Sequence, residues 1–177
     1  KLKKKPRVAI RVNMDTGVYP MWDRFGFNYE NGQALNALTK IVESEKMELT
    51  GLHCHIGTFM LTTNAYATAV KKLGDLAWKC KTQLKTPIQY IDLGGGFPSS
   101  NTLRGSFLPG TDSVPSVDEF AEAITTNLLG LGFSTEELPL LVLESGRVLI
   151  DDAGYLLSTV LANKRLSDGR RATILDA

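Results

Sequence analysis

Short aliphatic runs alternate with longer amphipathic stretches through the first 150 residues, an order that is typical of βαβ units around a parallel sheet. The pattern predicts strands over residues 7–12, 49–56, 88–93 and 138–143. It predicts one helix that Asn31 caps and that ends near residue 46, a second over residues 64–84, and a third that opens with a capping box at Ser116. The last strand is a continuous aliphatic run, so we expect it to be buried on both faces.

The pattern changes near residue 150. Strands are predicted over residues 154–161 and 172–175, and a polar turn joins them without an intervening helix. We therefore expect an α/β domain over residues 1–150 and the beginning of a β-rich domain over residues 151–177. Because the chain begins without Met and stops in an apolar run, we expect it to be an excerpt of a longer protein.

The carboxyl ends of the four predicted strands carry Arg11, His55, Gly94 and Glu144. Doubly wound sheets and (β/α)8 barrels both collect functional residues at this edge, because the strand fixes the backbone while the following loop is free to vary. Four strands cannot close a barrel, which needs eight. If the fold is a barrel, its other half precedes Lys1.

Composition narrows the classes of function. The chain has 20 Lys or Arg against 19 Asp or Glu, a formal charge of +1, which gives no support to binding of nucleic acid or of an anionic membrane. The sequence shows neither an apolar run long enough for a membrane span nor a signal-peptide layout. Cys54 and Cys80 match no metal-ligand spacing, so a reducing compartment, the cytoplasm, is the expected location.

Three glycines, Gly94, Gly95 and Gly96, follow the third predicted strand. The bare backbone of such a turn can bring N–H groups close to an anion, most often a phosphate. Thr58 could add a hydroxyl to the same site. The residues alone leave two plainer alternatives open, a flexible hinge for the glycines and an ordinary turn residue for Thr58.

His53 and His55 lie two residues apart and point to the same face if the strand is regular there. The chain has no other histidine, and no carboxylate cluster adjoins them in sequence, so a metal site is disfavoured. A packed core histidine is one alternative. At a strand end, however, His55 could stack its ring on a flat ligand or exchange a proton.

Glu144 follows the aliphatic fourth strand, so we expect a poorly solvated carboxylate that needs a cationic or N–H partner. Arg147, three residues later, is the expected partner. The pair could simply close the turn after the strand. Alternatively, Glu144 could face a protonated ring nitrogen while Arg147 binds an anionic group with its guanidinium fork.

Three ordered motifs together resemble the fold-type III pyridoxal-phosphate decarboxylases. They are GLHCHIGT at residues 51–58, IDLGGGFP at 91–98 and ESGR at 144–147. The His-Cys-His run and the later Gly-x-Leu at residues 154–156 are similar to the diaminopimelate decarboxylase branch of that family. The resemblance implies the C-terminal half of a (β/α)8 TIM-like barrel over residues 1–150, followed by the start of a C-terminal β domain over residues 151–177.

The resemblance also implies pyridoxal 5′-phosphate as the cofactor, a homodimer, and an amino-acid substrate such as diaminopimelate or a related basic or dicarboxylic amino acid. His55 would stack on the cofactor ring, Glu144 would pair with the pyridine nitrogen, and Arg147 and Arg11 are the candidate substrate contacts. No metal is expected. The residues expected to hold the phosphate are Thr58, Gly94, Gly95, Gly96, Ser145, Gly146 and Arg147. The lysine that joins the cofactor would precede Lys1, so this piece alone is expected to be inactive.

Three positions depart from the family pattern. Thr58, Ser145 and Arg24 stand where the family normally has Ser, Pro and Lys, and each change keeps a hydroxyl, a turn or a charge.

Three other functions compete with the decarboxylase. A regulatory homologue without cofactor is disfavoured because the motif residues persist, and a barrel that binds a sugar phosphate leaves the ESGR motif unexplained. An amino-acid racemase on the same barrel typically places an arginine near the ring nitrogen, which Glu144 argues against.

Overall fold

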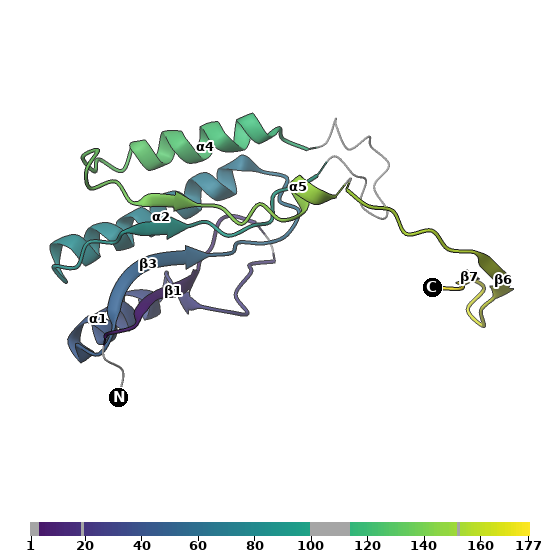
Figure 1. The fold of residues 1–177 in the computed structure, drawn as a ribbon, viewed down its shortest axis with the longest axis horizontal. Coiled ribbons are helices and arrows are strands. Elements are labelled where there is room, and N and C mark those ends of the chain that lie inside the picture. The colour runs from purple at the N-terminus through teal and green to yellow at the C-terminus, as the bar shows by residue number, and fades with distance from the viewer. Residues whose placement is uncertain (1–3, 19, 100–113, 152) are drawn as a thin grey trace.

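A parallel sheet of five strands, in the order β2-β1-β3-β4-β5, forms the centre of the computed structural model, which describes residues 4–18, 20–99, 114–151 and 153–177 (Figure 1). Each neighbouring pair of strands is parallel. The strands are β1 (Arg7–Asn13), β2 (Phe27–Asn28), β3 (Glu48–Cys54), β4 (Tyr90–Asp92) and β5 (Leu140–Val142). The α/β class with a parallel sheet is thereby confirmed.

Several strands differ from the prediction. β4 and β5 are shorter than the predicted runs over residues 88–93 and 138–143, and β2 was not predicted. β2 has only two residues, which pair with Val12 and Asn13 of β1, and a run that short carries no periodic signal. β3 ends at Cys54 rather than at residue 56, because its ladder with β1 stops at the pair Val12 and Cys54. His55 therefore lies just beyond the strand.

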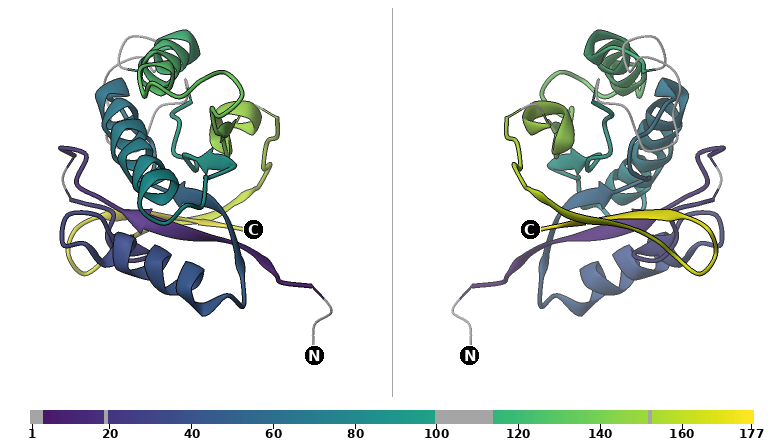
Figure 2. Two further views of the ribbon diagram at one scale, coloured as in Figure 1. Left: turned by 90° about the vertical axis from the view of Figure 1, so that its left-hand side faces the viewer. Right: turned by 90° about the vertical axis from the view of Figure 1, so that its right-hand side faces the viewer.

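Helices α1 (Gln33–Ser44), α2 (Thr63–Thr82) and α4 (Val117–Leu129) pack beside the sheet (Figure 2). α1 contacts β1, β2 and β3, α2 contacts β3, and α4 packs on α2. The inner face of α2 shows the apolar spacing of a helix that covers a sheet. Its buried side chains include Ala69, Val70, Leu73, Leu76, Ala77 and Cys80.

The capping residue predicted for α4 is confirmed, whereas the N-cap of α1 lies one residue later than predicted. The capping box of α4 is present: the Ser116 hydroxyl accepts a hydrogen bond from the Glu119 N–H at 3.2 Å, and the Glu119 carboxylate accepts one from the Ser116 N–H at 2.7 Å. The N-cap of α1 is Gly32 rather than Asn31. Asn31 still satisfies a free backbone donor, because its side chain accepts a hydrogen bond from the Gln33 N–H at 3.1 Å.

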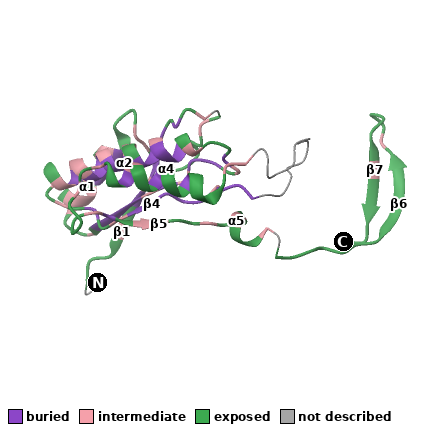
Figure 3. Ribbon diagram, turned by 90° about the horizontal axis from the view of Figure 1, so that it is seen from above, coloured by how far each residue is buried: buried purple, intermediate pink, exposed green. Residues whose placement is uncertain are grey.

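The hydrophobic core lies between the sheet and these helices, as the purple inner faces in Figure 3 show. Both cysteines are free and buried, as their spacing predicts. Among the described residues, no helix combines the length and the apolar character that a bilayer crossing requires. The largest fully buried side chains are Tyr66, Leu38, Leu52, Leu73, Leu76, Ile91, Leu93, Ile124, Val12, Val70, Thr50 and Cys54.

The prediction that the fourth aliphatic strand is buried on both faces is wrong. β5 is the edge strand of the sheet, and Leu140 and Leu143 are 69% and 43% exposed. An aliphatic run is buried on both faces only when neighbours cover both, and within the described residues β5 pairs on one side alone, with β4.

Beyond β5 the parallel α/β pattern gives way to an antiparallel hairpin, as predicted, but the bounds of the elements differ from the prediction. The short helix α5 (Arg147–Ile150) was not predicted. Residues 154–159 form no strand, because they have no ladder partner among the described residues. β6 (Val160–Arg165) and β7 (Arg171–Leu175) then form an antiparallel hairpin that extends away from the sheet (Figures 1 and 3). Apolar side chains such as Tyr155 and Leu161 are exposed along this segment.

Candidate functional site

The carboxyl ends of β3, β4 and β5 bring distant parts of the chain together. The Gly95 N–H donates to Nδ1 of His55 at 3.2 Å, and the Glu144 N–H donates to the carbonyl oxygen of Gly94 at 2.9 Å. Neighbouring parallel strands end at the same edge of a sheet, so residues that follow three different strands meet there. The residues of all three sequence motifs thus form one site.

The three glycines make a tight turn that a side chain would disrupt. Gly94 and Gly96 have φ angles of +67° and +101°, which L side chains rarely adopt. A Cβ at Gly96 would also overlap the carbonyl oxygen of Gly57. The Gly94 N–H donates to the Asp92 carboxylate at 2.8 Å. Because the N–H groups of Gly94 and Gly95 are both used within the protein, these two residues shape the turn.

Tyr66 of α2 fixes this turn from behind. Its hydroxyl donates to the carbonyl oxygen of Gly95 at 2.9 Å, and its ring stacks on Phe97 with the centroids 4.6 Å apart. The Phe120 ring of α4 meets the Tyr66 ring edge-on, with the centroids 5.4 Å apart. Burial raises the pKa of the Tyr66 phenol, so the hydroxyl keeps its proton and remains a donor at neutral pH.

An open cavity of about 510 Å³ lies in front of the turn. Two of the predicted site residues are not part of its lining: Gly94, which belongs to the turn itself, and Arg11 of β1, whose guanidinium lies 5.3 Å from the centroid of the Phe25 ring. The other predicted residues all line the cavity. Its lining comprises His55, Thr58, Gly95, Gly96, Phe97, Glu144, Ser145, Gly146 and Arg147.

His55 is held in a defined orientation. Because Nδ1 accepts the Gly95 N–H, the neutral imidazole carries its proton on Nε2. The Trp22 ring meets the imidazole edge-on, with the centroids 5.8 Å apart. Burial lowers the pKa of His55, and the nearby positive charge of Arg11 lowers it further, against the opposing effect of Glu144. His55 is therefore neutral at pH 7.

The lowered pKa of His55 predicts a pH dependence of stability. Between the pKa of the folded state and the ordinary value of 6.5, the unfolded chain binds more protons, so stability falls as the pH drops below about 6.5. We expect the variant His55→Gln to lose less unfolding free energy than the parent protein between about pH 7.5 and pH 5. Urea unfolding at both pH values measures this difference, and equal losses in the two proteins would contradict it.

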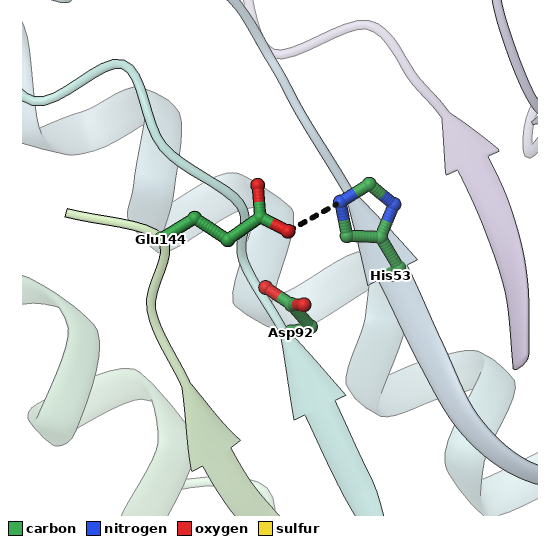
Figure 4. Close-up of side chains that lie close together, drawn as sticks. All are labelled: His53, Asp92 and Glu144. Atoms are coloured by element: carbon green, nitrogen blue, oxygen red, sulfur yellow. Dashed lines mark ion pairs between the residues drawn. The ribbon is translucent and has the colours of Figure 1, made fainter. Parts of the chain in front are cut away.

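The structure corrects two expectations about Glu144. Its side chain is 56% exposed rather than poorly solvated, because β5 is an edge strand. Its ion-pair partner within the described residues is His53, whose Nε2 lies 3.7 Å from Oε1 of Glu144 (Figure 4). Arg147 is not that partner: Gly146 turns the chain at φ +58°, and the Arg147 guanidinium lies 5.7 Å from the centroid of the Phe59 ring.

Sequence reasoning did not single out two residues of this region. Asp92 lies beside His53 and Glu144, and one side-chain ligand atom from each of the three lies within 4.8 Å of the others. Trp22 lies in the loop after β1, and its ring contacts His55. A carboxylate two residues before a glycine turn was a usable signal for Asp92, whereas no local pattern identifies the contact of Trp22.

Comparison with known proteins identifies the family. Residues 1–151 match the family model "Pyridoxal-dependent decarboxylase, pyridoxal binding domain". The chain is 31% identical over 153 residues to diaminopimelate decarboxylase of Bacillus subtilis, covering 86% of this chain and 34% of that protein. It is 30% identical over 163 residues to the enzyme of the same name from Methanocaldococcus jannaschii, covering 86% and 35%. The chain thus spans about a third of the length of these relatives.

Solved structures agree with this assignment. The crystal structure of diaminopimelate decarboxylase from M. jannaschii superposes with a TM-score of 0.75 at 27% identity, over 98% of this chain and 40% of that one. The structure of a Helicobacter pylori diaminopimelate decarboxylase mutant complexed with L-lysine gives a TM-score of 0.71 at 25% identity, over 98% and 41%. The chain belongs to the pyridoxal-dependent decarboxylases, and its residues 1–151 match the model of their pyridoxal-binding domain.

Proposed function

We propose that the full-length protein is a pyridoxal-phosphate-dependent decarboxylase that acts on diaminopimelate or on a related basic or dicarboxylic amino acid. The observation that carries this proposal is the cavity at the strand ends, which gathers a neutral histidine, a carboxylate, a glycine turn and an arginine. Relatives named diaminopimelate decarboxylase, two of them solved with L-lysine, support this class of substrate. Because the chain spans only a third of those proteins, the activity belongs to the longer molecule.

The residues present fit the cofactor of the family. The glycine turn keeps this wall of the cavity free of side chains, since a Cβ at Gly95 or Gly96 would overlap backbone. Thr58 supplies a hydroxyl and Arg147 a guanidinium at the same cavity, and both groups suit a phosphate. We propose that these two residues hold the phosphate together with the backbone of Gly96, Ser145 and Gly146, while Gly94 and Gly95 shape the turn.

Each remaining residue has a distinct task in this proposal. When bound, the cofactor supplies an electron sink for the pair that remains as carbon dioxide leaves. The Glu144 carboxylate holds a proton at the ring nitrogen, where its negative charge favours the protonated form. The His55 imidazole, neutral and braced by Trp22, covers one face of the ring and excludes water from it. Arg11 is the remaining candidate for the carboxylate of the substrate, and Arg147 is the alternative candidate if it does not bind the phosphate.

We further propose the organisation that the resemblance implies. Residues 1–150 would form the second half of a (β/α)8 barrel, and residues 151–177 would begin a C-terminal β domain. β5 has an open edge, and the hairpin segment exposes apolar side chains. Both features support the proposal that further protein covers these surfaces, from the rest of the full-length chain or from the second subunit of a homodimer. We place this enzyme in the cytoplasm.

A spectrum of the purified full-length protein tests the proposed function. With pyridoxal phosphate present, we expect a visible absorption band that borohydride abolishes, a covalent label on one lysine, and carbon dioxide release from diaminopimelate. Binding without carbon dioxide release from any basic or dicarboxylic amino acid, but with loss of optical activity, would favour the racemase. The absence of a band would favour the regulatory homologue without cofactor.

A further inference from the structure

We propose that His53 is a positioning residue that holds the Glu144 carboxylate in place for the ring nitrogen of the cofactor. The proposal rests on the proposed function, because it concerns how one residue of that site is kept in its working position. It assigns a role to the first histidine of the His-Cys-His run, which does not line the cavity.

Glu144 needs such a restraint. The backbone of Glu144 is anchored through its N–H to Gly94, but its side chain is 56% exposed and lies beyond the end of β5. A flexible acidic side chain in that setting samples several rotamers, and fixing it costs conformational entropy. Within the described residues, the only oppositely charged group that Glu144 contacts is the His53 imidazole, at 3.7 Å, and this contact is an ion pair when the imidazole is protonated.

His53, by contrast, is a fixed point. It lies on β3, in the middle of the sheet, with Arg11 of β1 and Asp92 of β4 as its register neighbours. Its side chain is 22% exposed. Side chains on a paired central strand hold their position more accurately than side chains on loops. Figure 4 shows the imidazole directed at the Glu144 carboxylate across the end of β4.

Asp92 explains why a positive or hydrogen-bonding group is required at this place. A carboxylate oxygen of Asp92 lies within 4.8 Å of one of Glu144, and like charges at this distance repel. Asp92 cannot move away without giving up its hydrogen bond to the Gly94 N–H. If His53 were absent, Glu144 would therefore be the carboxylate that turns to solvent, away from the ring nitrogen. The other charge that faces His53 is Arg11, which is held against Phe25.

A double-mutant cycle on the full-length protein tests the role of His53 without relying on turnover. In the parent protein, His53→Phe keeps a flat ring but removes the ring nitrogen that faces Glu144, and we expect it to raise the Kd for pyridoxal phosphate about tenfold and to alter the absorption spectrum of the bound cofactor. In a Glu144→Gln background, the same change should alter that Kd less than twofold. His53→Gln keeps a polar N–H group but cannot carry a positive charge, so it should restore only part of the affinity.

Controls separate positioning from folding. Glu48→Gln, at the exposed opposite end of β3, should leave the Kd unchanged, and thermal melting of each variant reports the fold. An equal effect of His53→Phe in both backgrounds would overturn the proposal, and so would an unchanged Kd in the parent background. If the parent protein binds no pyridoxal phosphate, the proposed function fails and this role fails with it. If the parent binds and decarboxylates while His53→Phe is silent, only the role of His53 fails.

Discussion

Replacing Glu144 with Gln in the full-length protein is expected to lower kcat by on the order of 10²–10³-fold while much of the cofactor stays bound. The amide has nearly the same shape but carries no charge, so it no longer favours a proton on the ring nitrogen, and the ring accepts the electron pair less readily. The proposed contacts of Thr58 and Arg147 with the cofactor do not involve this carboxylate and should persist. The loss should therefore appear in turnover more than in retention of the cofactor.

Steady-state decarboxylation together with cofactor content measures this prediction. Glu122→Gln is a matched control, because Glu122 is an exposed carboxylate on α4. Its kcat should equal that of the parent. Unchanged turnover in Glu144→Gln would remove the electronic role of this carboxylate, and the proposed role of His53 would lose its purpose.

The second large effect is expected from Gly96→Ala. The new Cβ would overlap the carbonyl oxygen of Gly57 and would sit on a backbone with φ +101°. Adding a methyl group to packed backbone and forcing it into positive φ together cost roughly 2–5 kcal/mol of unfolding free energy. Because Gly96 lines the cavity, a turn that shifts to relieve the overlap should also bind pyridoxal phosphate more weakly.

Gly132→Ala separates the cost of the Cβ overlap from the cost of the positive φ angle. Gly132 has a similar positive φ of +78°, but no heavy atom lies within 4 Å of the position of its Cβ. It should lose only the roughly 1–2 kcal/mol of the backbone conformation and keep its cofactor affinity. Urea unfolding and cofactor titration compare the two variants. Equal destabilisation would show that the contact with Gly57 costs nothing.

The sequence carried enough information to predict the convergence of the site. A parallel sheet places the ends of successive strands at one edge, so residues that follow separate strands, such as His55, Gly95 and Glu144, had to meet once the strands were recognised. The glycine turn and the capping box were equally accessible, because each depends on a short local pattern. Such features depend on neighbours in sequence or on the period of a strand.

The errors concern neighbours that are distant in sequence. Burial of β5 was inferred from its composition, but burial depends on whether another element covers the strand, and β5 lies at the sheet edge. The pairing of Glu144 with Arg147 was inferred from a separation of three residues, but the turn at Gly146 sends Arg147 toward Phe59. The actual partner, His53, lies 91 positions away along the chain, and only the order of the strands brings it close.

The contact of Tyr66 with the glycine turn has a consequence for anyone who engineers this protein. The helix α2 has an outer side, where Lys71 and Lys79 lie, and an inner side that includes Tyr66, which reaches the backbone of Gly95. Libraries that vary the outer side can tune solubility while leaving the cavity wall intact. Libraries that include Tyr66 would reshape the cofactor pocket from a helix that does not line it, so α2 should be divided by face when positions are chosen for randomisation.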